Sequence, residues 1–175
     1  SGADASGELC AFDCELDLWF PITVSGRGPS PRQGHSASLV RVPGAGSTPT
    51  EVMIIFGGSR KSNWLNDAHA FDTRAWRWLP LDARGAAPLP RSYHGSVAVN
   101  ETSMVVFGGN DALRTFADVH VLTVARAGDR SDGFVGTWTS VAQAGGVPPS
   151  PRAGAVVAPA PDPFAFVVFG GRDTH

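Results

Sequence analysis

The sequence predicts an all-β protein built from a repeated unit of four short strands. Apolar, β-branched runs end three times in Phe-Gly-Gly, at Gly58, Gly109 and Gly171. The motif Pro-x-Pro-Arg precedes each run and ends at Arg32, Arg91 and Arg152. Two prolines so close together are excluded from a central strand, so each motif marks a loop that leads into one. The 21 glycines, 14 prolines and only 17% charged residues also favour many turns between short strands.

Each unit contains four expected strands. In the best-defined copy they cover residues 34–42, 51–56, 67–71 and 76–79. The first follows Pro-x-Pro-Arg, the second runs into the double glycine, the third passes through Asn66-Asp67, and the fourth contains Trp78. Four strands within roughly 50 residues make one blade of a β-propeller.

The repeats divide the chain into four parts. Residues 1–19 form the second half of a blade, because the step from Phe12 to Trp19 equals that from Phe71 to Trp78. Residues 20–80 form a complete repeat, and residues 81–138 form another with an insertion at about 125–136. Residues 139–175 form the first half of a further blade.

These motifs resemble the kelch repeat, with its Arg-x-x-His, Phe-Gly-Gly, Asn-Asp-x-aromatic and downstream Trp, from Glu8 to Gly171. A Gly and His pair follows two of the arginines, as Gly34-His35 and in reversed order as His94-Gly95. The resemblance implies a kelch-type propeller, similar in fold to the central propeller of galactose oxidase. Roughly three four-stranded blades of a six- or seven-bladed ring fit in this chain.

The residues that recur once per repeat are expected to be structural. They are Arg32, His35, Gly57, Gly58, Trp78, Arg91, His94, Gly108, Gly109, Trp138, Arg152, Gly170 and Gly171. Trp19, Trp78 and Trp138 are interpreted as core, because in the kelch family such a tryptophan packs between blades. Anion binding by Arg32 and Arg91 is the alternative to structural contacts. His69 and His120 are expected to be half-buried rings between strands.

Composition excludes several function classes. The net charge of −2 and scattered Lys and Arg give no basic stripe for nucleic acid. No apolar run approaches the ~20 residues of a membrane span. Cys10 and Cys14 would lie about 13 Å apart on a strand, too far for a disulfide. Free thiols suit a reducing compartment, so we expect a cytoplasmic location, with the nucleus as the alternative.

The loops between the second and third strands are the candidate binding face, because variable loops on a rigid sheet carry recognition. Their candidate partner-binding residues are Arg60, Lys61, Asn63, Trp64, Arg114 and Arg172. Trp64 aligns with Thr115 and is the exposed candidate, although folding back onto a neighbouring blade is equally open. Guanidinium groups would favour an acidic or phosphorylated segment of another protein.

Catalysis within these residues is not expected. Copper radical oxidases of similar fold need several tyrosines, and Tyr93 is the only one here. The carboxylate and histidine run that binds iron in plant kelch specifier proteins is absent too, so no metal or cofactor is predicted. The expected function is an adaptor or scaffold that binds another protein. The alternative is a targeting or regulatory kelch domain of a larger enzyme, such as a phosphatase, a methyltransferase or a ubiquitin-ligase adaptor.

The predicted ring is incomplete. The chain is expected to be part of a longer protein. The alternative is self-association, in which two copies arranged head to tail complete each other's half blade and close a six-bladed ring.

Overall fold

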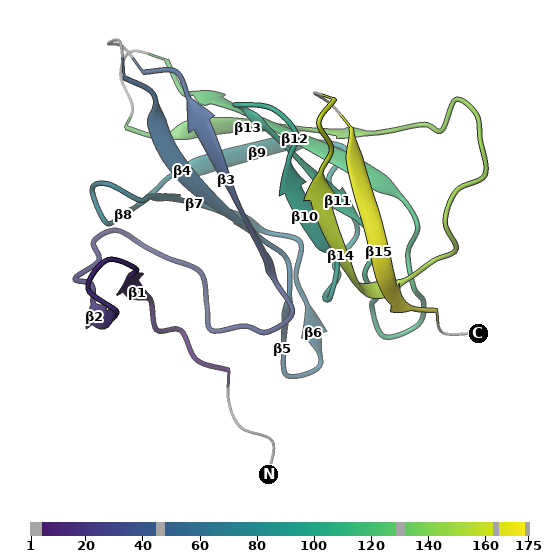
Figure 1. Ribbon diagram of the computed structural model, residues 1–175, viewed down its shortest axis with the longest axis horizontal. Helices are drawn as coiled ribbons and strands as arrows, with labels where there is room; N and C mark the ends of the chain where they lie inside the picture. The colour runs from purple at the N-terminus through teal and green to yellow at the C-terminus, as the bar shows by residue number, and fades with distance from the viewer. Residues whose placement is uncertain (1–4, 45–47, 129–131, 163–164, 174–175) are drawn as a thin grey trace.

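The computed structural model describes residues 5–44, 48–128, 132–162 and 165–173, and every regular element among them is a β-strand. The strands form two large sheets and three two-stranded sheets. The all-β prediction is therefore confirmed, and the arrangement is that of partial propeller blades (Figure 1). No helix in the described ranges has the length and apolar character needed to cross a membrane.

Blade A is a four-stranded antiparallel sheet in the order β3-β4-β7-β8. Its strands are β3 (Ser36–Val42), β4 (Thr50–Phe56), β7 (Ala68–Asp72) and β8 (Arg77–Leu79). Strand β3 alternates buried with exposed positions, so only one of its faces is packed. Strand β4 ends in three consecutive buried apolar residues, which is typical of a strand covered on both faces.

Blade B has the order β10-β11-β12-β13-β9 and therefore a fifth strand that the sequence did not predict. Its strands are β9 (Leu81–Gly85), β10 (Gly95–Ala98), β11 (Ser103–Phe107), β12 (Val119–Arg126) and β13 (Phe134–Ser140). Strand β9 leaves blade A and pairs in parallel with β13, so it joins the outer edges of the two blades.

The insertion expected at about 125–136 extends two paired strands. Ala125 and Arg126 end β12, and Phe134 to Gly136 begin β13, with Arg126 directly opposite Phe134. Phe134 is buried, and the two segments pair as antiparallel strands, so their backbone N–H and C=O groups find hydrogen-bond partners. The extra residues therefore lengthen a hairpin; residues 129–131 lie outside the described ranges.

Two half-blades lie on opposite sides of the molecule (Figure 1). The N-terminal half-blade consists of β1 (Cys10–Asp13) and β2 (Leu18–Pro21). The C-terminal half-blade consists of β14 (Ala153–Pro159) and β15 (Phe166–Arg172). The pairs Phe12 with Trp19 and Phe71 with Trp78 are both directly opposed across antiparallel strands, so the N-terminal half-blade has the geometry of a blade's last two strands.

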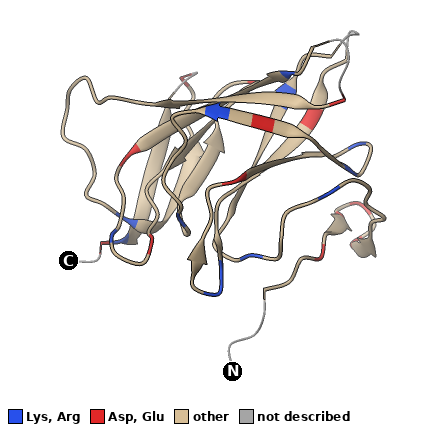
Figure 2. Cartoon of the chain, turned by 180° about the vertical axis from the view of Figure 1, so that it is seen from behind, with Lys and Arg blue, Asp and Glu red and all other residues tan. Residues whose placement is uncertain are grey.

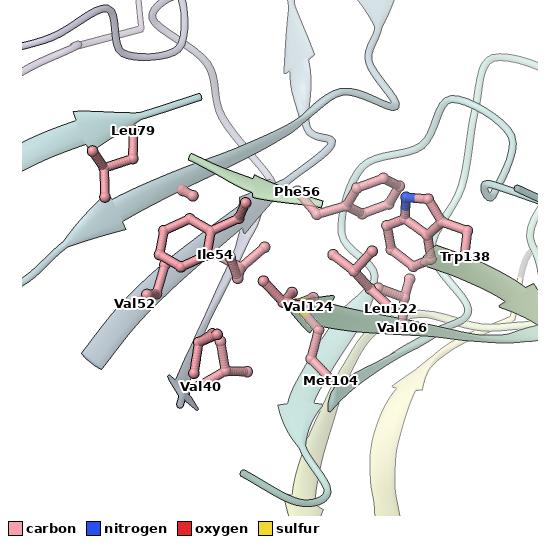
Figure 3. Packing of buried hydrophobic residues seen from close by; sticks show 13 residues of the cluster. Val40, Val52, Ile54, Phe56, Leu79, Met104, Val106, Leu122, Val124 and Trp138 are labelled. Atoms are coloured by element: carbon pink, nitrogen blue, oxygen red, sulfur yellow. The ribbon is translucent and has the colours of Figure 1, made fainter. Parts of the chain in front are cut away.

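The core lies between blades A and B (Figure 3). Its buried members are Val40, Val42, Val52, Ile54, Phe56, Ala70, Leu79, Met104, Val106, Leu122, Val124, Phe134 and Trp138. Trp138 of blade B packs on Phe56 of blade A, with 4.8 Å between the ring centroids. Aromatic side chains of this size contribute strongly to packing, so this contact anchors one blade on the next.

The three tryptophans differ in burial. Trp138 is buried as expected, and Trp78 is half-buried. Trp19 is 68% exposed, so its assignment to the core is wrong for this structure. The physical reason is that no described strand packs over the exposed face of β2.

Candidate functional site

An arginine clamp recurs at the start of each blade. The Arg32 Nε donates to Ser30 O at 3.0 Å, and its Nη1 donates to Gly57 O at 3.0 Å. Its two Nη atoms donate to the Asp67 carboxylate at 2.6 and 2.9 Å. These bonds use the guanidinium within its own blade, so Arg32 has a structural role and is not presented to a ligand.

Arg91 repeats this contact set in blade B. It donates to Leu89 O at 3.0 Å, to Gly108 O at 3.0 Å, and to both carboxylate oxygens of Asp118 at 2.6 and 2.9 Å. The Arg91 side chain is fully buried, and its guanidinium also stacks 4.0 Å from the centre of the Phe116 ring. These hydrogen bonds and the ring contact thus compensate the buried charge of Arg91.

The pKa values of both carboxylates are lowered. Partial burial opposes ionisation of Asp67, but hydrogen bonds from His69 and Arg32 outweigh it and hold the pKa well below the usual range. The pKa of Asp118 is likewise lowered by Arg91 and His120 against its burial. The pairing of these aspartates with the arginines was not predicted from sequence. The signal was present, since each complete repeat contains one Pro-x-Pro-Arg and one Asp two residues before a His.

His69 and His120 follow these aspartates on the third strand of each blade. The Nε2 atom of His69 lies 2.7 Å from Asp67, and that of His120 lies 3.0 Å from Asp118. The Nδ1 atom of His120 also lies 3.0 Å from Ala86 O, so His120 links blade B to the segment that follows β9. His69 is half-buried and His120 is buried.

The double glycines form the seam between blades. The Gly58 N–H donates to Arg91 O at 2.8 Å, and the Gly109 N–H donates to Arg152 O at 2.9 Å. Gly58 has φ +93°, and a Cβ added there would lie 2.8 Å from Gln33 O. Glycine is required because the chain adopts positive φ where another backbone approaches within contact distance.

The innermost strands meet in a second, polar seam. His94 Nε2 lies 2.8 Å from Ser36 Oγ, and the hydroxyls of Ser38 and Ser96 are 2.7 Å apart. Burial, together with the nearby charges of Arg91 and His35, lowers the pKa of His94 to about 3. His94 is therefore neutral in the folded protein, and its neighbour His35 also has a lowered pKa, through burial and Arg32.

Backbone hydrogen bonds between the blades show which residues of the Gly and His pairs are equivalent. The Tyr93 N–H donates to Gly34 O and the Gly154 N–H donates to Tyr93 O, both at 2.8 Å. These three residues have positive φ values of 63°, 55° and 70° for Gly34, Tyr93 and Gly154. Tyr93 is thus the equivalent of Gly34, and His94 is the equivalent of His35.

The predicted binding loop of blade A is an ordered hairpin, formed by β5 (Ser59–Arg60) and β6 (Asn63–Trp64). Its base is fixed at both ends, since Ser59 pairs with Gln33 and Leu65 accepts a bond from the Arg91 N–H at 3.1 Å. Arg60 and Lys61 are exposed at its tip, together with Asn63. No carboxylate lies within ion-pair distance of Arg60 or Lys61 in the part of the chain that the structure describes.

The other predicted contact residues have different surroundings. Trp64 is half-buried, and its Nε1 is enclosed without a hydrogen-bond partner among the described residues. Arg114 is exposed but lies 3.5 Å from Asp111, so its charge is partly neutralised. Arg172 is exposed at the end of β15.

The structure brings the loops that carry these residues to one end of the blades. The bonds from Arg91 N to Leu65 O and from Arg152 N to Phe116 O dock each Pro-x-Pro-Arg loop on the preceding blade's loop. Figure 2 shows Lys and Arg at the tip of the β5–β6 hairpin and again near the C-terminus on the same lower side. This surface, formed by residues 59–64, 110–115 and the end of β15, is named the loop face.

Other chemistry is sparse among the described residues. They contain no group of three or more His, Cys, Asp or Glu side chains that could hold a metal ion. Cys10 and Cys14 are free and exposed. A shallow hollow of about 510 Å³ is lined by Tyr93, Ala153, Gly154, Gly171 and Arg172 at the loop face.

Comparison with known proteins decides the family. Residues 1–175 match the KLHDC2/KLHL20/DRC7 Kelch-repeats domain. The chain belongs to this kelch-repeat family. The arginine clamps and double-glycine seams described above are thus features of a kelch-repeat domain, and the resemblance seen in the sequence is confirmed.

Several curated kelch relatives share this domain at about one-third identity. Acyl-CoA-binding domain-containing protein 4 of Arabidopsis thaliana is 33% identical over 150 residues, which cover 85% of this chain and 20% of that protein. Rab9 effector protein with kelch motifs of Mus musculus is 32% identical over 136 residues, or 77% of this chain and 32% of that protein. Kelch domain-containing protein 3 of Homo sapiens is 33% identical over 107 residues, or 60% and 25%. The kelch-repeat chain therefore spans a third or less of each of these relatives.

Proposed function

We propose that this kelch-repeat domain binds another protein through its loop face, and that it recognises an acidic or phosphorylated segment there. The observation that carries the proposal is the contrast between two sets of basic side chains. Arg32 and Arg91 are used inside their blades, whereas Arg60 and Lys61 are displayed on an ordered hairpin without a carboxylate partner among the described residues.

The hairpin suits recognition because it is held in place. Bonds from Gln33 and Arg91 fix its base, so little conformational entropy is lost when a partner binds at its tip. Two adjacent cations on such a support favour carboxylate or phosphate oxygens. Arg172 adds charge at the same face, while Arg114 contributes less because Asp111 already neutralises part of its charge.

Charge reversal tests the proposal. The probes are short fluorescent peptides of matched sequence: one rich in Asp and Glu, one with phosphoserine, and one with Asn and Gln instead. We expect the first two to bind, the third not to bind, and Arg60→Glu with Lys61→Glu to abolish binding. Arg84→Glu is the control, because Arg84 lies on β9, away from the loop face. Equal binding of the neutral peptide, or equal loss with the control, would refute the assignment.

A second candidate is a kelch domain that targets a longer protein to its partner. The relatives favour it, since the name of one of them carries a further function, namely acyl-CoA binding. In either case the loop face performs recognition, and no catalytic step is assigned to these residues. The mass of the endogenous protein, measured with antibody to the kelch repeats, distinguishes the two: a mass well above 18.3 kDa supports the second.

A further inference from the structure

The motif Pro-x-Pro-Arg carries a serine between its two prolines in two of the three repeats. Ser30 precedes Pro31, and Ser150 precedes Pro151. Leu89 occupies the same position in blade B, which nevertheless forms a complete arginine clamp. The clamp therefore does not need a hydroxyl at this position, and the fold does not account for the two serines.

The hydroxyl of Ser150 lies against the guanidinium of Arg152. Ser150 Oγ accepts a hydrogen bond from Arg152 Nη2 at 3.1 Å. Two further bonds hold the guanidinium in place, since its Nε donates to Ser150 O at 3.0 Å and its Nη1 donates to Gly170 O at 3.1 Å. A serine that accepts a bond through its oxygen keeps its own proton, so the hydroxyl can still give that proton to a base.

The same contact exists in a complete clamp. In blade A, Arg32 Nη2 lies 3.3 Å from Ser30 Oγ while it also donates to Asp67 at 2.9 Å. One nitrogen atom of the arginine therefore serves both the serine oxygen and the carboxylate oxygen. The contact between serine and arginine does not depend on an arginine that has no aspartate beside it.

The position of Ser150 is open to solvent. Ser150 and the two residues before it are exposed. Leu89 shows that this exposure is a property of the position, because the loop that carries it joins complete blades A and B and Leu89 is still 49% exposed. Figure 1 shows the segment that leads into β14 as the long yellow-green loop beside the sheets. Another macromolecule can therefore reach Ser150.

The prolines on both sides keep Ser150 extended. Proline fixes its own φ and excludes the helical region for the residue before it. Residues 147–152 accordingly have no regular secondary structure, and the bond from Arg152 N to Phe116 O anchors the end of this segment. A protein kinase binds its substrate as an extended chain on both sides of the hydroxyl. Proline directly after the serine selects the proline-directed class of kinases, because proline brings no N–H that the kinase must satisfy.

We propose that Ser150 is a phosphorylation site for a proline-directed protein kinase, and that the phosphate pairs with Arg152. In the transfer, Ser150 Oγ bonds to the γ-phosphorus of ATP, and the bond from this phosphorus to the bridging oxygen breaks. ADP leaves, and the hydroxyl proton passes to a base of the kinase. The product carries a charge of about −1.5 to −2 near neutral pH. Because Arg152 Nη2 already reaches Oγ, a phosphate oxygen can take over this hydrogen bond as a charged acceptor.

Phosphorylation of the full folded chain tests the site. The probe is a cyclin-dependent kinase with ATP, and mass spectrometry of proteolytic peptides locates the phosphate. Ser30 and Thr48 also precede a proline, so the test chain carries Ser30→Ala and Thr48→Ala. We expect one phosphate on Ser150 and none after the further change Ser150→Ala. In the unchanged chain Ser150 should be modified faster than Ser30, because Ser30 is half-buried.

Phosphorus NMR tests the pairing with Arg152. A neighbouring guanidinium favours the dianion, so the second pKa of the phosphoserine should lie below the value of ~6 for an unpaired phosphate. Arg152→Gln should bring this pKa back towards the value measured in the phosphorylated peptide of residues 145–155. Arg152→Lys keeps the charge and should retain part of the shift. Circular dichroism checks that both variants fold.

Three results would overturn the proposal. The first is a folded chain that gains no phosphate on Ser150, whether or not the kinase modifies the isolated peptide. The second is modification of Ser30 in preference to Ser150. The third is the same phosphate pKa in Arg152→Gln as in the parent chain, which would show that the phosphate does not contact the guanidinium.

Discussion

Arg91 and Asp118 form a bidentate ion pair in which the arginine side chain is completely buried and the aspartate is 37% exposed. The pair joins the loop that enters blade B to the start of its third strand. Because the guanidinium has no water to solvate it, the carboxylate is the compensation that permits its burial.

Removal of this carboxylate should destabilise the protein. Asp118→Ala leaves a buried charge without its partner, so we expect a loss of about 2–4 kcal/mol in the free energy of unfolding, measured by urea denaturation. The control is Asp82→Ala, whose carboxylate pairs with Arg84 on the exposed surface of β9. It should cause no measurable change. Similar losses for both variants would contradict the structural role of the clamp.

The free energy of unfolding should decrease as the pH is lowered, over the range between the folded and unfolded pKa values of His94. Its pKa is about 3 in the folded protein and near 6.5 in the unfolded chain, so the unfolded state binds the proton first. Stability is therefore complete above pH ~6.5 and is lost as the pH falls from there towards 3. Urea denaturation between pH 7 and pH 4.5 measures this slope before most of the aspartate contribution is lost.

The control for this slope is a pair of histidine variants. His94→Gln should flatten the dependence markedly, whereas His35→Gln should reduce it less, because Ser36 and the inner strands enclose His94 more completely. An unchanged slope in His94→Gln would show that other groups cause the acid sensitivity.

Substitution of a seam glycine should be costly. Gly109→Ala places a Cβ 2.7 Å from Ser92 O at a residue with φ +90°, so both strain and a clash result. We expect a loss of about 2 kcal/mol or more in thermal or urea unfolding. Gly145→Ala is the matched control, because nothing lies within 4 Å of its added Cβ. Equal stability of the two variants would refute the close approach at the seam.

The loss of stability on replacing a tryptophan should depend on how deeply its ring is buried. Trp138→Ala removes a ring that is 3% exposed and packed on Phe56, so we expect a loss of about 3–5 kcal/mol. Trp19→Ala should have a small effect, because that ring is 68% exposed. A large loss in the Trp19 variant would contradict the exposed position of this ring.

Much of the fold followed from local sequence signals. Phe56-Gly57-Gly58 and its repeats located the second strands, and Pro-x-Pro-Arg located the loops, because backbone constraints at Pro and Gly act within a few residues. The pairing of β9 with β13 was not predictable in this way, since it depends on the neighbouring blade and leaves no periodic pattern in residues 81–85.

The candidate site was harder to predict from sequence than the fold. The loops with Arg60, Lys61 and Arg114 were identified by position in the repeat, but the side-chain environments were not. The burial of Trp64 Nε1 and the pairing of Arg114 with Asp111 depend on tertiary contacts. The equivalence of Tyr93 with Gly34 was not evident from sequence, because a tyrosine occupies a positive φ that glycine fills in the other two repeats.

Amide hydrogen exchange with and without the acidic peptide tests recognition by the loop face most directly. We expect slower exchange on binding in residues 59–64, with smaller effects at 110–115 and at the end of β15, and no change in β9 or at the β12–β13 turn. Protection centred on β9 or on the β12–β13 hairpin, with residues 59–64 unchanged, would contradict it.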